Sequence, residues 1–177
     1  MKNVFRTNTS FSDQQIRDIF NSINDISDFF VFEVIYKILI KIKHTRVIKH
    51  TNIVQLFAFL RYIIQRFNIN TEDCINLLVS KNQDYTGNDP DFFSNFFTLL
   101  EYDDFDYSDY KQFVVIYTGL LSRLGDKLRR IETFLNGNKL NHEGFEDSVK
   151  DFINYCIIAY LFLQRAVEKS VIKYSDN

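Results

Sequence analysis

Acidic residues occur in two predicted helices at positions where a helix in a bundle normally carries apolar side chains. Asp147, Asp151 and Asn154 follow one another at intervals of four and three residues, a spacing that places them on one face of a helix. Asp126 lies in the preceding helical segment, directly before Lys127. Like charges one turn apart disfavour a helix unless a cation or a ligand compensates them. Carboxylates facing one another across a bundle, with basic side chains nearby, suit Mg²⁺ and a polyphosphate, and a solvated acidic face is the alternative.

A second group of residues suited to chemistry occurs in KNQDYTGNDPDFFSNF, residues 81–96. Gly87, Asn88, Asp89 and Pro90 in succession predict an irregular loop. The side chains that this loop offers are those of Lys81, Asp84, Tyr85, Asn88, Phe92, Phe93, Asn95 and Phe96. A nucleotide requires charge for its phosphates and a ring face for its base, and this segment contains both. A polar surface loop anchored by its phenylalanines is the alternative.

The composition predicts long helices around a large core. The 177 residues include only five Gly and one Pro, too few for a turn-rich β fold. Hydrophobic residues make up 46% of the chain and include 19 Phe and 10 Tyr, enough to fill a core. The formal net charge of -2 provides no global basic field, so we expect no direct nucleic-acid partner.

No pattern predicts zinc, a disulfide or a membrane span. Cys74 and Cys156 belong to no ligand cluster and are expected to be buried thiols of a cytoplasmic protein. The three histidines lack metal-ligand spacing, and the N-terminal segment lacks the apolar core of a signal peptide. The most apolar run, residues 29–42, carries Glu33, Lys37 and Lys41. We therefore expect no membrane-spanning helix, because such a helix needs about 20 mostly uncharged residues.

Hydrophobic periodicity and capping residues divide the chain into helices. We expect a helix from Gln14 and further helices over residues 29–43, 52–67, 71 to about 81, 111–135, and about 141 to 174. The ladder Glu33, Lys37 and Lys41 favours a helix over a strand in the first of these apolar segments. The segment HTRVIKHTN, residues 44–52, is expected to be a polar connection.

Two further features each have a structural and a functional explanation. The acidic segment 101–110 is expected to be a solvated connection whose Ser108 or Asp109 caps the next helix, with a metal-binding carboxylate cluster as the alternative. Gly125 lies inside the helix predicted over residues 111–135. Because a mid-helix glycine costs about 1 kcal/mol relative to alanine, we expect a packing or ligand-binding reason for it.

Three segments together resemble a known family. RLGDKLRRIETFLNG and HEGFEDSVKDFINY resemble the core pattern R-x-x-D-K-x-x-R … E-x-x-x-D-x-x-x-D-x-x-N-Y of a phage and bacterial family, the nucleotide-modification-associated domain. KNQDYTGNDPDFFSNF resembles its other signature, K-N-x-D-Y followed by F-x-N-F. The pieces occur in the family's order over about residues 72–165. The family is similar to all-α nucleoside triphosphate pyrophosphatases of the MazG and dimeric dUTPase type, which hold Mg²⁺ with helical ExxE and ExxD carboxylates and cut between the α and β phosphates.

The resemblance implies an all-α helical bundle. Residues 71–177 would form a four-helix core like that of the pyrophosphatases, and residues 1–70 an N-terminal helical extension. It also implies a homo-oligomer, in particular a dimer, in the cytoplasm of a bacterial cell, with a bacterial or a phage gene as the two origins.

The resemblance implies a site on the same residues. The catalytic residues would be Asp126, Asp147 and Asp151, and these three with Glu143 would hold Mg²⁺. The substrate-binding residues would be Lys81, Asp84, Tyr85, Asn95, Arg123, Lys127, Arg130 and Asn154. The chain departs from the pattern because Arg123 and Asp126 occupy the ExxE register and Asp147 and Asp151 are four residues apart. Fewer carboxylates imply fewer metals, or a site that binds a nucleotide without hydrolysing it.

Three functions follow from these features. The first is Mg²⁺-dependent pyrophosphohydrolysis of a (deoxy)nucleoside triphosphate in nucleotide metabolism or modification, with one metal activating water and another steadying the leaving pyrophosphate. The second is a non-catalytic protein that binds or sequesters a nucleotide, and the smaller number of carboxylates relative to the family's pattern favours it. The third is a helical interaction protein, which the aromatic surplus favours.

Overall fold

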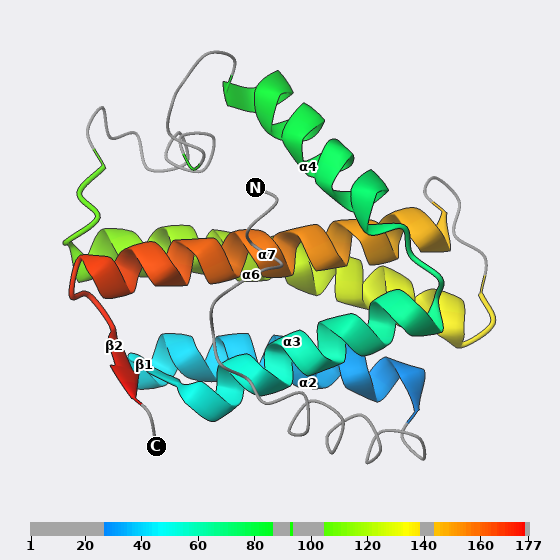
Figure 1. The fold of residues 1–177 in the computed structure, drawn as a ribbon, viewed down its shortest axis with the longest axis horizontal. Helices are drawn as coiled ribbons and strands as arrows, with labels where there is room; N and C mark the ends of the chain where they lie inside the picture. The colour runs from blue at the N-terminus through cyan, green and yellow to red at the C-terminus, as the bar shows by residue number, and fades with distance from the viewer. Residues whose placement is uncertain (1–26, 87–92, 94–104, 139–143, 176–177) are drawn as a thin grey trace.

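The computed structural model describes residues 27–86, 93, 105–138 and 144–175. Helices dominate this part of the chain, and its two short strands form one small sheet (Figure 1). The helices are α2 (Asp28–Thr45), α3 (His50–Arg66), α4 (Thr71–Thr86), α6 (Tyr110–Leu135) and α7 (Phe145–Glu168). The strands are β1 (Val47–Lys49) and β2 (Lys173–Ser175). The predicted all-α class is confirmed.

The helices are arranged in three layers. Helices α6 and α7 run side by side in opposite directions through the centre (Figure 1). On one side α2 packs against α6 and against α3, and on the other side α4 contacts α7. The surface where α4, α6 and α7 meet is therefore distinct from the surface between α2 and α6.

Local sequence explains the first of these helices. The Ser27 side chain caps α2 by accepting from the Phe30 amide at 3.4 Å, and Glu33 and Lys37 form an i,i+4 ion pair at 2.8 Å. The chain leaves α2 at Arg46, whose φ of 56° ends the helix in the left-handed region. The helix predicted over residues 29–43 is confirmed, as are those over 52–67 and 111–135 to within two residues at each end.

Aromatic rings fill the core between the layers. Phe113 of α6 stacks on Phe162 of α7 with centroids 5.4 Å apart and planes 2° apart. Tyr117 stacks on Phe113 and donates its hydroxyl hydrogen to the Leu39 carbonyl of α2 at 3.2 Å. Such a buried hydroxyl needs a partner, and α2 provides it. One cluster of buried side chains includes residues of α2, α3, α4, α6 and α7, so the hydrophobic core crosses the boundary that we predicted at residue 70.

Two predicted elements differ from the structure. The segment predicted as a polar connection contains β1, which pairs in parallel with β2 in the register Val47 to Lys173. The last helix, predicted to reach Tyr174, ends at Glu168, and Ser170 follows with φ of 60°. Pairing between strands more than 120 residues apart has no local sequence signal, whereas the helical periodicity extends past the true end.

Helix α4 is longer than predicted. It continues to Thr86, so Lys81 and Asp84 lie on a helix and not in a loop. Phe93, the one described residue between 87 and 104, is buried against Phe162 with centroids 5.2 Å apart. The helix predicted from Gln14 lies outside the described residues. None of the helices described is long and apolar enough to cross a membrane.

Candidate functional site

A buried carboxylate joins three helices at the surface where α4, α6 and α7 meet. Asp151 of α7 is only 6% exposed. Its Oδ1 accepts from Lys81 Nζ of α4 at 2.7 Å, and its Oδ2 accepts from Lys127 Nζ of α6 at 2.7 Å. One aspartate therefore binds two lysines that lie 46 residues apart in the chain.

Helix α4 directs Lys81 towards this point. Cys74, Leu78 and Lys81 follow at intervals of four and three residues, which places them on one face. Cys74 and Leu78 are buried, so the same face carries Lys81 to α7. A second contact holds the start of α4, since Lys150 of α7 lies 3.7 Å from Asp73.

Helix α6 directs Lys127 inwards in a similar way. Leu124, Leu128 and Ile131 are buried against the rest of the bundle, and Lys127 lies on the edge of that face with a side chain only 15% exposed. A lysine this enclosed carries its charge at a position where solvent does little to screen it.

The lysines decide the charge state of Asp151. Burial alone raises the pKa of Asp151, but the hydrogen bonds and positive charges of Lys127 and Lys81 together outweigh burial and lower the pKa below its ordinary value. Asp151 is therefore ionised at neutral pH. Two ammonium groups therefore bind one ionised carboxylate.

Arg123 and Tyr155 complete the charged surroundings. Burial raises the pKa of Tyr155, and the positive charges of Arg123, Lys127 and Lys81 act on the same hydroxyl in the opposite direction. These three cations thus lie within electrostatic reach of one phenol. Among the described residues, three cations thus gather around the single carboxylate of Asp151.

A buried amide lies one turn further along α7. Asn154 is 4% exposed, and neither its Nδ2 nor its Oδ1 has a hydrogen-bond partner among the described residues. The Oγ of Ser148, on the turn before Asp151, is also buried without a partner there. Leaving a buried polar group unpaired costs about 1–3 kcal/mol. We call Lys81, Arg123, Lys127, Asp151, Asn154 and Tyr155 the Asp151 cluster.

The other two predicted catalytic aspartates do not join this cluster. Asp126 has a side chain 48% exposed and pairs with Arg129 of its own helix at 2.8 Å. Asp147 is exposed in the first turn of α7, and its carboxylate turns back towards Gly144, the N-cap residue. A carboxylate in a first helical turn is stabilised by the helix dipole, which accounts for Asp147 in this position without a partner in Asp151.

The remaining predicted site residues are placed less centrally. Asp84 is exposed on α4 one turn after Lys81, and Arg130 is exposed on α6. Tyr85 lies in the last turn of α4, and its side chain is not described. Asn95 and Glu143 lie outside the described residues.

The donor set of the cluster does not fit Mg²⁺. Both oxygens of Asp151 are occupied by ammonium groups, and a cation at this carboxylate would stand beside two positive charges. Mg²⁺ prefers several oxygen ligands in octahedral geometry. In the described part of the chain, no group of three or more His, Cys, Asp or Glu side chains lies close enough to hold a metal ion. The arrangement is suited to an anion.

Sequence reasoning gave no role to Tyr155 of the cluster or to the neighbouring Ser148. Ser148 and Tyr155 fall three residues before and four residues after Asp151, on the same helix face. This spacing was the signal that could have identified them. The pairing of carboxylates in the sequence favours Asp147 instead.

Comparisons of the chain with known proteins identify no relative. No protein-family model, no curated protein and no solved structure matches it.

Proposed function

We propose that this protein binds a nucleotide through its phosphate groups at the Asp151 cluster. One observation carries the proposal: a buried carboxylate holds two lysines from neighbouring helices, and Arg123 lies within electrostatic reach of the same point. The resemblance of three segments to a nucleotide-modification-associated family supports it from the sequence. The cluster contains six residues, and five of them were predicted from the sequence as site residues.

Phosphate is the anion that these side chains suit best. An ammonium group is a compact charge with three donors, of which Asp151 takes one from each lysine. Lys81 keeps two further donors for phosphate oxygens, and Arg123 adds a planar fork that binds two oxygens together. Because Lys127 is largely enclosed, its bond to a phosphate would be stronger than one formed in open solvent.

The polar side chains of α7 would fix the sugar or the base. The Asn154 amide offers a donor and an acceptor that no described residue uses. The Tyr155 ring lies one turn after Asp151 and is half-buried. A nucleotide that pairs with this amide would relieve the cost of leaving it unsatisfied.

Binding without turnover is the function that the geometry supports best. In this proposal Mg²⁺ enters the site bound to the polyphosphate and is not held beforehand by protein ligands. Pyrophosphohydrolysis is a second candidate, since Asp147 is exposed one turn before Asp151 and would be accessible to Mg²⁺ bound to the nucleotide. The chain's own residues would then only hold and orient the phosphates.

A thermal-shift screen tests the proposal. A ligand at 100 times its Kd stabilises a protein by about 2.7 kcal/mol, and for a chain of this size that corresponds to about 5–10 °C. We expect such a rise with at least one ribo- or deoxynucleoside triphosphate, in EDTA as well as in Mg²⁺. Pyrophosphate release measured on the same samples decides between the two candidates.

Matched variants locate the site. Lys127→Gln and Arg123→Gln should each weaken nucleotide binding about tenfold or more, because each removes a charged donor. Lys111→Gln removes the same charge from the exposed start of α6 and should bind as the wild type does. A nucleotide shift that survives both cluster variants, or the absence of a shift with every nucleotide, would contradict the proposal.

A further inference from the structure

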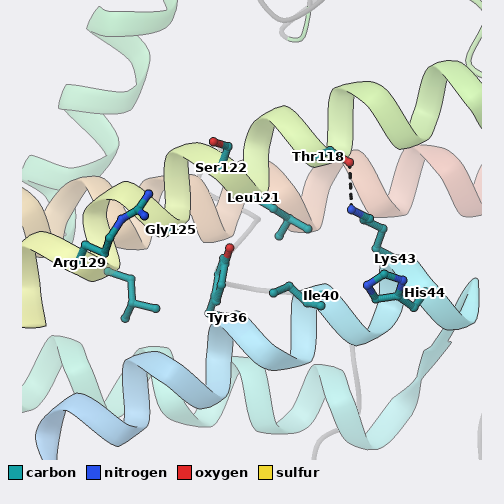
Figure 2. A pocket seen from close by; sticks show the side chains of 10 residues that line it. Tyr36, Ile40, Lys43, His44, Thr118, Leu121, Ser122, Gly125 and Arg129 are labelled. Carbon is teal, nitrogen blue, oxygen red and sulfur yellow. Dashed lines mark hydrogen bonds between the residues drawn. The ribbon is translucent and has the colours of Figure 1, made fainter.

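A groove lies between α2 and α6 (Figure 2). Its volume of about 440 Å³ falls within the range of small-molecule sites, about 300–1,000 Å³. The residues that line it are Tyr36, Ile40, Lys43 and His44 of α2, and Thr118, Leu121, Ser122, Gly125, Leu128 and Arg129 of α6. None of them belongs to the Asp151 cluster, so this groove is a separate feature.

Gly125 shapes the groove. A Cβ atom at this position would lie 3.0 Å from the Tyr36 hydroxyl oxygen and 3.4 Å from its Cζ. The missing side chain therefore lets the Tyr36 ring approach the backbone of α6. In Figure 2 the Tyr36 side chain rises from α2 towards α6 and forms one wall of the groove. This close approach is the packing reason that the mid-helix glycine requires.

The polar groups of the groove are donors and cations. Lys43 Nζ donates to Thr118 Oγ1 at 3.1 Å, as the dashed line in Figure 2 shows. No carboxylate among the described residues pairs with Lys43, and an ammonium group has two more donors. His44 lies beside Lys43, and Arg129, which pairs with Asp126, lies at the other end. None of the described lining residues is Asp or Glu. A negatively charged group would meet complementary charge here.

Between these ends the groove is apolar. Ile40, Leu121 and Leu128 line it, and Leu121 and Leu128 belong to the buried core. A small inorganic anion would leave this surface wet, whereas an uncharged apolar molecule would leave Lys43 without a counter-charge. The lining therefore suits a ligand that has both an apolar body and an anionic group.

We propose that the α2–α6 groove is a binding site for a small amphipathic anion. The apolar body lies along Ile40 and Leu121, and the carboxylate, phosphate or sulfonate group binds Lys43. This site is independent of the nucleotide site. If the proposal for this groove fails, the proposal for the Asp151 cluster is unaffected, and the reverse also holds.

A matched pair of fluorescent probes tests this site. 8-Anilinonaphthalene-1-sulfonate carries an aromatic body and one sulfonate, and N-phenyl-1-naphthylamine has the same body without the charge. We expect the sulfonate to bind the intact protein saturably at one site, with an affinity at least about tenfold higher than that of the neutral probe, because a charged hydrogen bond is worth about this factor.

Four variants decide where the sulfonate binds. Lys43→Gln should weaken its binding about tenfold, and Ser122→Phe should block it, since Ser122 is an exposed position on the groove. Lys41→Gln removes the same charge from an exposed position of α2 outside the groove and should bind as the wild type does, as should Lys127→Gln. Equal binding by the Lys43 and Lys41 variants, equal binding of the two probes, or loss only in the Lys127 variant would overturn the proposal.

Discussion

Replacing Asp151 by asparagine tests the buried charge cluster through stability alone. Two bonds of 2.7 Å to the two oxygens of one carboxylate place Lys81 Nζ and Lys127 Nζ no more than about 8 Å apart. At an effective dielectric constant of about 20, two positive charges at this distance repel by about 2 kcal/mol once the carboxylate is gone. In asparagine an NH₂ group replaces one carboxylate oxygen, so one of the two lysines would face a donor instead of an acceptor.

We therefore expect Asp151→Asn to lower the free energy of unfolding by about 3 kcal/mol, the low end for breaking a buried ion pair. The low end applies because Lys81 is 46% exposed and can turn to solvent. Urea unfolding followed by circular dichroism measures the change. The slope of the free energy of unfolding against urea concentration should be similar in the wild type and in Asp151→Asn. The double variant Asp151→Asn with Lys127→Met removes the repulsion and should recover part of the loss.

Asp126→Asn is the matched control. It breaks an ion pair of the same type, with Arg129 at 2.8 Å, but this pair is exposed, so we expect a loss below about 0.5 kcal/mol. If the Asp151 and Asp126 variants differ by less than about 0.5 kcal/mol, the Asp151 cluster is not the buried charge centre that we describe.

Three further predictions address pH, the core and Gly125. The pKa of Asp151 is lowered in the folded state, so its contribution to stability is fully present above the unfolded pKa of about 3.9 and is lost as the pH falls through the folded pKa. The free energy of unfolding should therefore fall more steeply below about pH 4 in the wild type than in Asp151→Asn. Parallel curves for the two proteins would contradict this. Tyr117→Phe removes a buried hydrogen bond to the Leu39 carbonyl and should cost about 1 kcal/mol in urea unfolding, so an unchanged midpoint would show that this bond contributes nothing. The Tyr36→Phe background removes the 3.0 Å contact with the hydroxyl oxygen, so adding Gly125→Ala to it should raise the free energy of unfolding by about 1 kcal/mol through helix propensity. A decrease would show that the ring at position 36 cannot move away from the added methyl group.

The helices could be predicted because their signals are local. The Glu33–Lys37 pair, the apolar periodicity of α6 and its Asp109 cap are read within a few residues, and all three occur in the structure. The pairing of β1 with β2 could not be read in this way, since neither three-residue strand carries a signal for a partner so distant in sequence.

The site was predictable in its members but not in its arrangement. The sequence singles out Lys81, Lys127 and Asp151, and the structure places both lysines in direct contact with Asp151. Helical spacing alone also grouped Asp147 with Asp151, because it cannot tell where the helix begins. Since α7 starts at Phe145, Asp147 falls in the exposed first turn, and the charge that compensates Asp151 comes from lysines on two other helices.

The central claim is that the positive charge held around Asp151 binds the phosphates of a nucleotide. Isothermal titration calorimetry in EDTA should compare the best nucleotide of the thermal-shift screen with the corresponding nucleoside, using the wild type, Lys127→Gln and Lys111→Gln. We predict that the nucleotide binds at one site and the nucleoside at least about tenfold more weakly, and that Lys127→Gln alone loses this difference. Equal affinity for nucleotide and nucleoside, or an unchanged nucleotide affinity in Lys127→Gln, would contradict the account.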